Sequence, residues 1–122
     1  MNRYLRMALL AGCLAGTTQI IGADEAVSIA VRPAVTVARG STQLKVFVER
    51  NDRNRSLKWE VDGPNYYRSS SLELEGASSP RSWFFNVHNL PEGEYDVRVT
   101  VTRNDKSEAV ALSNIKVLPG LP

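Results

Sequence analysis

The sequence contains one cysteine and one histidine in 122 residues, and only 7% of the residues are aromatic. A single thiol excludes a disulfide framework, and one imidazole with one thiol excludes a Cys/His zinc site built within one chain. Wholesale disorder is excluded as well, because 43% of the residues are hydrophobic. The length is that of one domain of ordinary size.

The first residues have the pattern of an export signal. Arg3 and Arg6 form a positive start, and an uncharged stretch rich in alanine and leucine follows over residues 7–16. This stretch is shorter than the roughly 20 residues that a transmembrane helix requires. Ala23 then provides a small residue at a cleavage site. We therefore predict a secreted or periplasmic protein with two parts, a signal peptide over residues 1–23 and one domain over residues 24–122.

A lipoprotein signal is the alternative for the same segment. The residues Leu10-Ala11-Gly12-Cys13 resemble the bacterial lipobox, in which the cysteine becomes the lipid-modified first residue. Lipidation of Cys13 would anchor the protein in the cell envelope, whereas cleavage after Ala23 would release it. Either route removes or blocks the only thiol, so the domain needs no oxidant to fold.

The charge of the predicted domain argues against two classes of partner. The whole chain has a formal net charge of +2. Without Arg3 and Arg6, 13 basic residues balance 13 acidic ones, so the domain is formally neutral. Nucleic acids and anionic membranes require a strong positive footprint. We therefore predict no nucleic-acid partner, and no membrane contact unless Cys13 is lipidated.

From residue 27 onward, apolar residues recur at every second position, which is typical of half-buried β-strands. Turn residues separate the runs, and Pro33 cannot donate to a ladder, so the first run should break or change sheet there. Seven or eight short strands predict an all-β fold, an antiparallel sandwich of two sheets. The last run slips phase at Ser113 and Asn114, which predicts a bulge. The runs cover residues 27–31, 35–37, 44–48, 57–61, 72–74, 83–87, 95–101 and 110–117.

Two local patterns resemble immunoglobulin-like and fibronectin type III-like domains. Trp59 lies on a predicted strand with alternating neighbours, as the core tryptophan of those domains does. The segment Leu90-Pro91-Glu92-Gly93-Glu94-Tyr95 is similar to their turn into the F strand. The resemblance implies that Tyr95 closes this corner with a hydrogen bond to upstream backbone, and that Gly93 supplies backbone freedom. It covers residues 27–118 and implies an immunoglobulin-like sandwich held by apolar packing, because the cysteine pair of antibody domains is absent.

Catalytic and metal-binding motifs are scarce in the sequence. His88 is the only candidate imidazole base, and no serine sits in a Gly-x-Ser-x-Gly elbow. The acidic turn residues lack the closely spaced carboxylates that calcium requires. Other carboxylates lie beside turns or alternate outward on predicted strands, as solvated groups do, and these are Glu73, Glu75, Glu92 and Glu94. We predict no cofactor, no metal site and no enzymatic activity.

Two aromatic features indicate candidate contact surfaces. Tyr66, Tyr67 and Arg68 follow a turn, and adjacent residues of a strand point to opposite faces, so one tyrosine should face outward. Phe47 opposes the buried set of its run, and of three successive aromatic residues either Phe84 or its two neighbours, Trp83 and Phe85, point away from the interior. If Phe47 and Phe84 share an outer face, they form an apolar patch for a partner chain or ligand.

These observations favour a secreted, non-catalytic immunoglobulin-like module that mediates protein–protein interaction or adhesion. Its partner, another protein or a second copy, would bind through a sheet edge or the outer aromatics. The alternative is a carbohydrate-binding module that holds a polysaccharide on Tyr66, Tyr67 and Trp83. A small secreted hydrolase is the third hypothesis and requires His88. The sequence leaves the ligand and the oligomeric state open.

Overall fold

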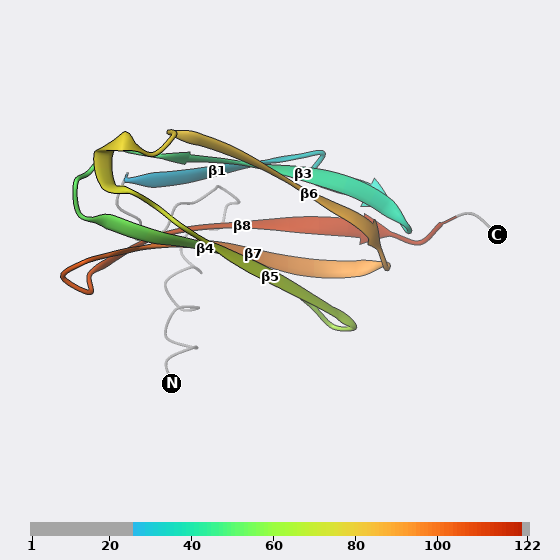
Figure 1. The fold of residues 1–122 in the computed structure, drawn as a ribbon. Coiled ribbons are helices and arrows are strands. Elements are labelled where there is room, and N and C mark those ends of the chain that lie inside the picture. Colours follow the sequence, from blue (N-terminus) through green and yellow to red (C-terminus); the bar gives the residue numbers. More distant parts are fainter. Residues whose placement is uncertain (1–25, 121–122) are drawn as a thin grey trace, which may run out of the picture.

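The computed structural model describes residues 26–120, and the predictions for Cys13 and Ala23 lie outside these residues. The described chain folds into eight β-strands and one short 3-10 turn (Figure 1). Within this part of the chain, no helix is long and apolar enough to cross a lipid bilayer. The elements are β1 (Val27–Arg32), β2 (Val35–Val37), β3 (Gly40–Val48), β4 (Asn54–Gly63), β5 (Tyr66–Glu73), η1 (Gly76–Ser78), β6 (Ser82–Leu90), β7 (Gly93–Arg103) and β8 (Glu108–Leu118).

The strands form two sheets that face each other in a β-sandwich (Figure 1). One sheet has three strands in the order β1-β3-β6, and the other has five strands in the order β2-β8-β7-β4-β5. The prediction of an all-β protein with two sheets is therefore confirmed.

The chain changes sheet at Pro33, as its missing N–H predicts. β1 pairs with β3 in the first sheet, whereas β2 pairs with β8 in the second. The prediction of a wholly antiparallel sandwich is wrong here, because β2 and β8 are parallel. The short link of Pro33 and Ala34 shifts the chain across to the other sheet rather than turning it back.

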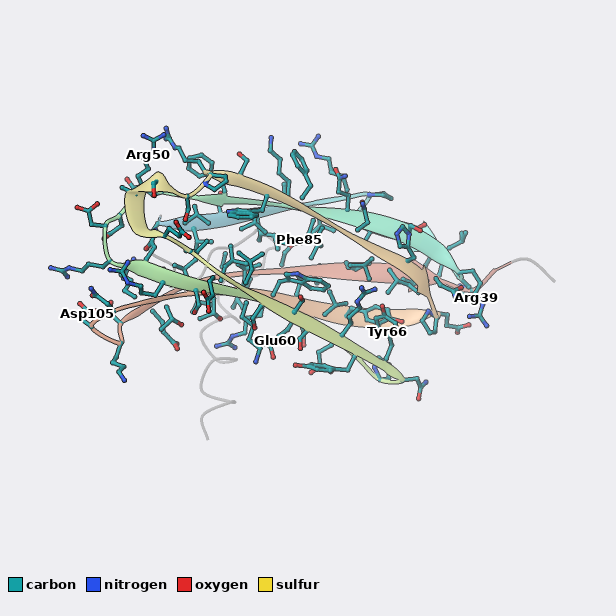
Figure 2. The ribbon with its side chains drawn as sticks, viewed as in Figure 1. Arg39, Arg50, Glu60, Tyr66, Phe85 and Asp105 are labelled. Carbon is teal, nitrogen blue, oxygen red and sulfur yellow. The ribbon has the colours of Figure 1, made fainter. Side chains whose placement is uncertain are left out.

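The core lies between the two sheets and is filled by alternate residues of the strands, as the apolar period predicts. Trp59 on β4 is only 3% exposed. Its ring packs on Phe85 of β6 with the centroids 5.5 Å apart, so one aromatic pair joins the two sheets. Figure 2 shows Phe85 pointing into the space between them. The largest side chains that are almost wholly buried are Tyr95, Leu44, Leu57, Leu90 and Ile115.

The predicted bulge at Ser113 and Asn114 is wrong. β8 pairs with β7 in one unbroken register from Glu108 to Val117. The inward positions of its first half hold Ala109 and Ala111, and the larger Val110 and Leu112 face the other way. Both faces of this stretch are apolar. The larger residues, Val110 and Leu112, therefore predicted the wrong inward face, and the change to Ile115 and Val117 then looked like a slip of phase. Irregular pairing occurs instead between residues 40 and 42 and between residues 54 and 56.

The corner before β7 is closed by Tyr95. Its hydroxyl donates a hydrogen bond to the carbonyl oxygen of Pro91, and the residue is 1% exposed. Gly93 has a φ of 146°, a backbone conformation that favours glycine. The hydrogen bond that the resemblance implied for Tyr95 is therefore present.

Burial of Tyr95 predicts a loss of stability in alkali. Burial, with a smaller contribution from Tyr66, raises the pKa of Tyr95 above its ordinary value of 10.0. The unfolded chain loses this proton near pH 10, whereas the folded chain holds it to higher pH. The stabilisation is therefore complete below pH 10 and is lost as the pH rises through the raised pKa. Urea unfolding measures the free energy of unfolding at pH 8 and at pH 11. Its decrease between the two pH values should be smaller in Tyr95→Phe than in the parent, and equal decreases would contradict the assignment.

Candidate functional site

Phe47 and Phe84 lie on the same outer face of the three-stranded sheet. In the β3–β6 register, Phe84 is opposite Lys45, and Phe47 is two positions further along β3. The two phenylalanines are therefore diagonal neighbours on one face. They are 36% and 56% exposed, respectively. The structure thus places together the two aromatic residues that the sequence suggested for one patch.

Each of these rings carries a cation over its face. The Nζ atom of Lys45 lies 5.6 Å from the ring centroid of Phe84. The guanidinium carbon of Arg81, just before β6, lies 5.3 Å from the centroid of Phe47. Both distances allow a cation–π attraction. The cations and rings therefore alternate across the face instead of forming separate charged and apolar areas.

A hollow of about 230 Å³ lies beside Phe84. Phe84, Lys45 and Arg32 line it, together with Ala30 and Gln43. No aspartate or glutamate occurs on β1, β3 or β6, all of which belong to the described chain. The positive charge of the face is therefore not balanced by carboxylates on its own strands. We call this surface the basic-aromatic face and define it by Arg32, Lys45, Phe47, Arg81 and Phe84.

Sequence reasoning found the two phenylalanines of this face but missed its three cations. Lys45 and Arg32 are unremarkable when each is read with its chain neighbours. The sequence does show that three separate strands lack acidic residues. This predicts a positively charged face only once those strands are known to form one sheet.

The second candidate, Tyr66-Tyr67-Arg68, is divided between the two faces of β5. Tyr66 points inward and packs edge-on against Tyr95, with the ring centroids 5.7 Å apart (Figure 2). Tyr67 points outward, is 55% exposed, and donates from its hydroxyl to a carboxylate oxygen of Glu60 at 2.9 Å. Arg68 shares the inward side and lies 5.8 Å from the Trp59 ring. The three side chains therefore do not form one site.

The aromatic residues suggested for sugar stacking are also separated. Trp83 lies on β6 of the other sheet and packs against the core, whereas Tyr67 is on the outer face of the five-stranded sheet. Tyr66 is engaged by Tyr95. Tyr66, Tyr67 and Trp83 therefore do not make a flat platform together.

His88 lies on the outside of β6 and contacts one serine. Its Nδ1 atom is 3.1 Å from the hydroxyl oxygen of Ser41, and both residues are exposed. Catalytic triads add a third group that orients the histidine. The strands that carry this pair, β3 and β6, have no carboxylate to do so. The sequence reading of His88 did not anticipate Ser41, because the contact depends on strand pairing.

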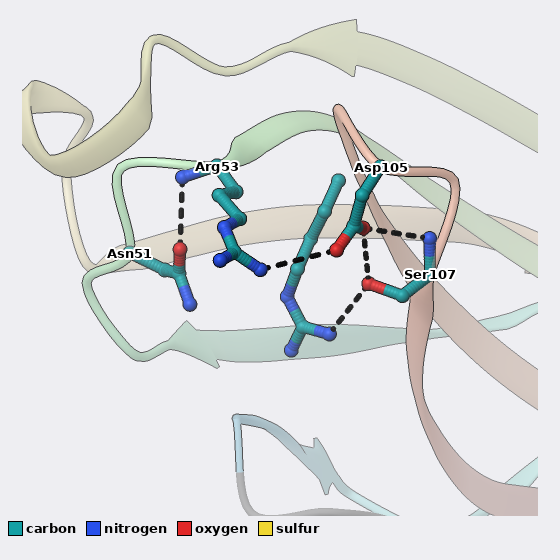
Figure 3. A network of polar contacts seen from close by, with 5 residues as sticks. Asn51, Arg53, Asp105 and Ser107 are labelled. Atoms are coloured by element: carbon teal, nitrogen blue, oxygen red, sulfur yellow. Dashed lines mark hydrogen bonds and ion pairs between the residues drawn. The ribbon is translucent and has the colours of Figure 1, made fainter.

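A polar network joins two loops at one end of the sandwich (Figure 3). Arg53 and Asp105 form an ion pair of 3.1 Å, and Asn51 accepts a hydrogen bond from the backbone N–H of Arg53. Hydrogen bonds from the hydroxyl and N–H groups of Ser107, with a smaller effect of Arg53, lower the pKa of Asp105. These contacts fit turn chemistry. Over residues 26–120, no group of three or more His, Cys, Asp or Glu side chains could hold a metal ion.

Comparisons with known proteins identify related folds. No protein-family model matches the chain, and no curated protein matches it by sequence. Among solved structures, a superoxide reductase (neelaredoxin) from Ignicoccus hospitalis is similar, with a TM-score of 0.61 and 16% identity over 76% of this chain and 80% of that one. A CARDB domain from Pyrococcus furiosus, solved in complex with di-metal ions, has a TM-score of 0.53 and 19% identity over 86% of this chain and all of that one. At these identities the likeness concerns the fold alone.

The prediction that the chain is not an enzyme is contradicted by these comparisons. Superoxide reductases are enzymes, and they share its β fold. The prediction rested on the lack of a serine elbow and of a surviving thiol, and on the interpretation of His88 and the candidate carboxylates as solvated groups. Such motifs report only some reaction classes, so their absence did not justify excluding catalysis.

Proposed function

We propose that the chain is an exported immunoglobulin-like module that binds an acidic segment of a protein partner through the basic-aromatic face. The pattern of residues 1–23 supports export. The immunoglobulin-like assignment is supported by the strand order of the two sheets, by the Tyr95 corner, and by the buried Trp59 on β4.

The exposed phenylalanines of the basic-aromatic face are the observation that carries the proposal. Phe84 is the most exposed large hydrophobic side chain that the structure describes, and Phe47 is its diagonal neighbour. Full burial of such a ring contributes about 1.5–3 kcal/mol. Aromatic and arginine side chains at the centre of an interface commonly supply most of its binding energy.

The charges of the face indicate the chemistry of the partner. Arg32, Lys45 and Arg81 surround the two rings, and their strands contribute no acidic residue. A partner segment with carboxylates beside an apolar side chain would pair with the cations while covering Phe84. Such complementarity speeds association and selects the partner, and salt screens it.

Phe84→Ala tests this proposal. Proteins of the host's exported fraction are captured with the parent chain, and the retained partner is then titrated against the variants. We expect the dissociation constant to rise at least about tenfold for Phe84→Ala, because a central anchor costs more than about 1.4 kcal/mol when it is truncated. Raising the salt concentration should weaken the parent complex.

Tyr67→Ala is the matched control for that experiment. Tyr67 is as exposed as Phe84 but lies on the outer face of the other sheet. It should leave the dissociation constant unchanged. Equal losses in the two variants, or retention of an acidic polysaccharide in place of a protein, would overturn the proposal.

A further inference from the structure

The edge strand β5 is long, regular and paired on one side only. It pairs with β4 at every position from Tyr66 to Glu73, without a bulge. It is the last strand of its sheet and contains neither proline nor glycine. Natural sheets commonly protect such edges with short strands, proline, bulges or inward charges. Of these, β5 has only one inward charge, Arg68, which lies over the Trp59 ring. The opposite edge of the same sheet, β2, is only three residues long.

Alternate residues of β5 present free backbone groups at this edge. The N–H of Leu74 donates to the carbonyl of Arg55, which continues the β4–β5 register by one position. Hydrogen-bonded and non-bonded pairs alternate along an antiparallel ladder. The even-numbered residues of β5 therefore bond to β4. The N–H and C=O groups of the odd-numbered residues point away from it, and these residues are Tyr67, Ser69, Ser71 and Glu73.

The side chains of β5 leave the edge accessible. Ser69, Ser70 and Ser71 form its centre, so no bulky group blocks an approaching strand. Arg68 and Glu73 are its only charged residues, which gives the strand no net charge. Arg68 and Ser70 are exposed although they point to the same side as the core residues of β4. The three-stranded sheet therefore does not cover this part of β5.

We propose that β5 pairs antiparallel with β5 of a second copy of this chain, around a two-fold axis at Ser70. This register pairs Ser69 with Ser71 and Tyr67 with Glu73 of the other copy, which satisfies all four residues with free backbone groups. Moving the axis by one residue would place a residue outside β5 opposite Tyr67 or Glu73. In this register, even-numbered residues of one β5 lie opposite even-numbered residues of the other. The inward face of one sheet therefore continues into the inward face of the other.

The dimer has one continuous ten-stranded sheet made from the two five-stranded sheets. Two strands of zero net charge do not repel each other, which distinguishes self-pairing from capture of a charged segment. The proposal is independent of the proposed function, because the basic-aromatic face lies on the other sheet. The dimer would nevertheless present two such faces to a partner.

Light scattering after size-exclusion chromatography of the full chain tests the dimer. A contact limited to one strand pair is a small interface, so we expect weak association. The measured molar mass should be that of a dimer at a protein concentration of about 100 μM and that of a monomer at about 1 μM. Ser71→Pro removes an N–H at the free edge and leaves the ladder with β4 intact, so it should give monomers at both concentrations. Ser71→Ala, the matched control, should still form dimers. The urea midpoint of each variant reports whether it is folded.

Cross-linking provides a second test that needs no proline. Ser70→Cys in a Cys13→Ser background should form a disulfide-linked dimer in a glutathione redox buffer. Facing residues of a non-bonded pair have Cα atoms about 4.5 Å apart, which a disulfide can span. Lys58→Cys, on the outer face of β4, should not cross-link. A monomer at every concentration, a dimer that survives Ser71→Pro, or equal cross-linking from Lys58→Cys would overturn the proposal.

Discussion

Alanine in place of Trp59 is expected to lower the free energy of unfolding by about 3–5 kcal/mol. The indole is 3% exposed, packs on Phe85 across the sandwich, and lies beneath the guanidinium of Arg68. Its removal loses the transfer free energy of a large ring and leaves a cavity that two paired sheets cannot close. Urea unfolding followed by circular dichroism measures the change.

Two further variants separate packing from other effects of this substitution. Phe84→Ala removes a ring of similar kind from the surface and should change stability by no more than about 0.5 kcal/mol. Trp59→Phe should cost less than about 1.5 kcal/mol. It keeps a ring, and the indole N–H that it removes has no hydrogen-bond partner among the described residues. A Trp59→Ala cost no larger than that of Phe84→Ala would contradict the central place given to this ring.

A methyl group added at Gly63 is expected to destabilise the fold by about 1–3 kcal/mol through overpacking. A Cβ atom at this position would lie 2.5 Å from both Cδ2 and Cε2 of Tyr95. The Tyr95 ring is held in place, because Tyr66 packs against it and its hydroxyl donates a hydrogen bond to the carbonyl oxygen of Pro91. The clash therefore has to be relieved by moving β4 or the corner before β7.

A control and a double variant test this explanation of Gly63. Gly120→Ala should be neutral, because its added Cβ would meet Ala38 at an ordinary distance of 3.5 Å. In a Tyr95→Leu background the ring is gone, so Gly63→Ala should cost much less than in the parent. Additive costs of the two substitutions would show that Tyr95 is not the obstacle.

The sequence predicted most of the strands, because one face of each is buried. It missed most of β5, since the predicted run at residues 72–74 covers only its last two residues. The run around Val97 alternates large apolar with polar residues, and this pattern fixes both the strand and its inward face. The pattern failed on β8, where Val110 and Leu112 are larger than the buried Ala109 and Ala111. The larger side chains of this stretch predicted the wrong inward face, because its pairing with β7 places the alanines toward the core.

The candidate site was less predictable, because its neighbours come from different strands. Exposure of Phe47 follows from its position within its run, whereas the sequence left open whether Phe84 or its two aromatic neighbours face outward. The contacts of Lys45 with Phe84 and of Ser41 with His88 depend on the register between β3 and β6. Local periodicity shows which face of each strand is buried, but it does not show which residues of β3 and β6 lie opposite each other.

The crossover at Pro33 also determines how the sandwich bears a mechanical load. β2, which follows the crossover, runs parallel to the last strand, β8. A pull applied to the two ends of the described chain loads β1 and its pairing with β3 first, and once transmitted through β1 it drags β2 and β8 in opposite directions along their length. The hydrogen bonds between them are loaded together, in shear, and do not open one after another as in a peeled hairpin. The shortest strand of the fold thus lies on the line of force between the ends of the domain.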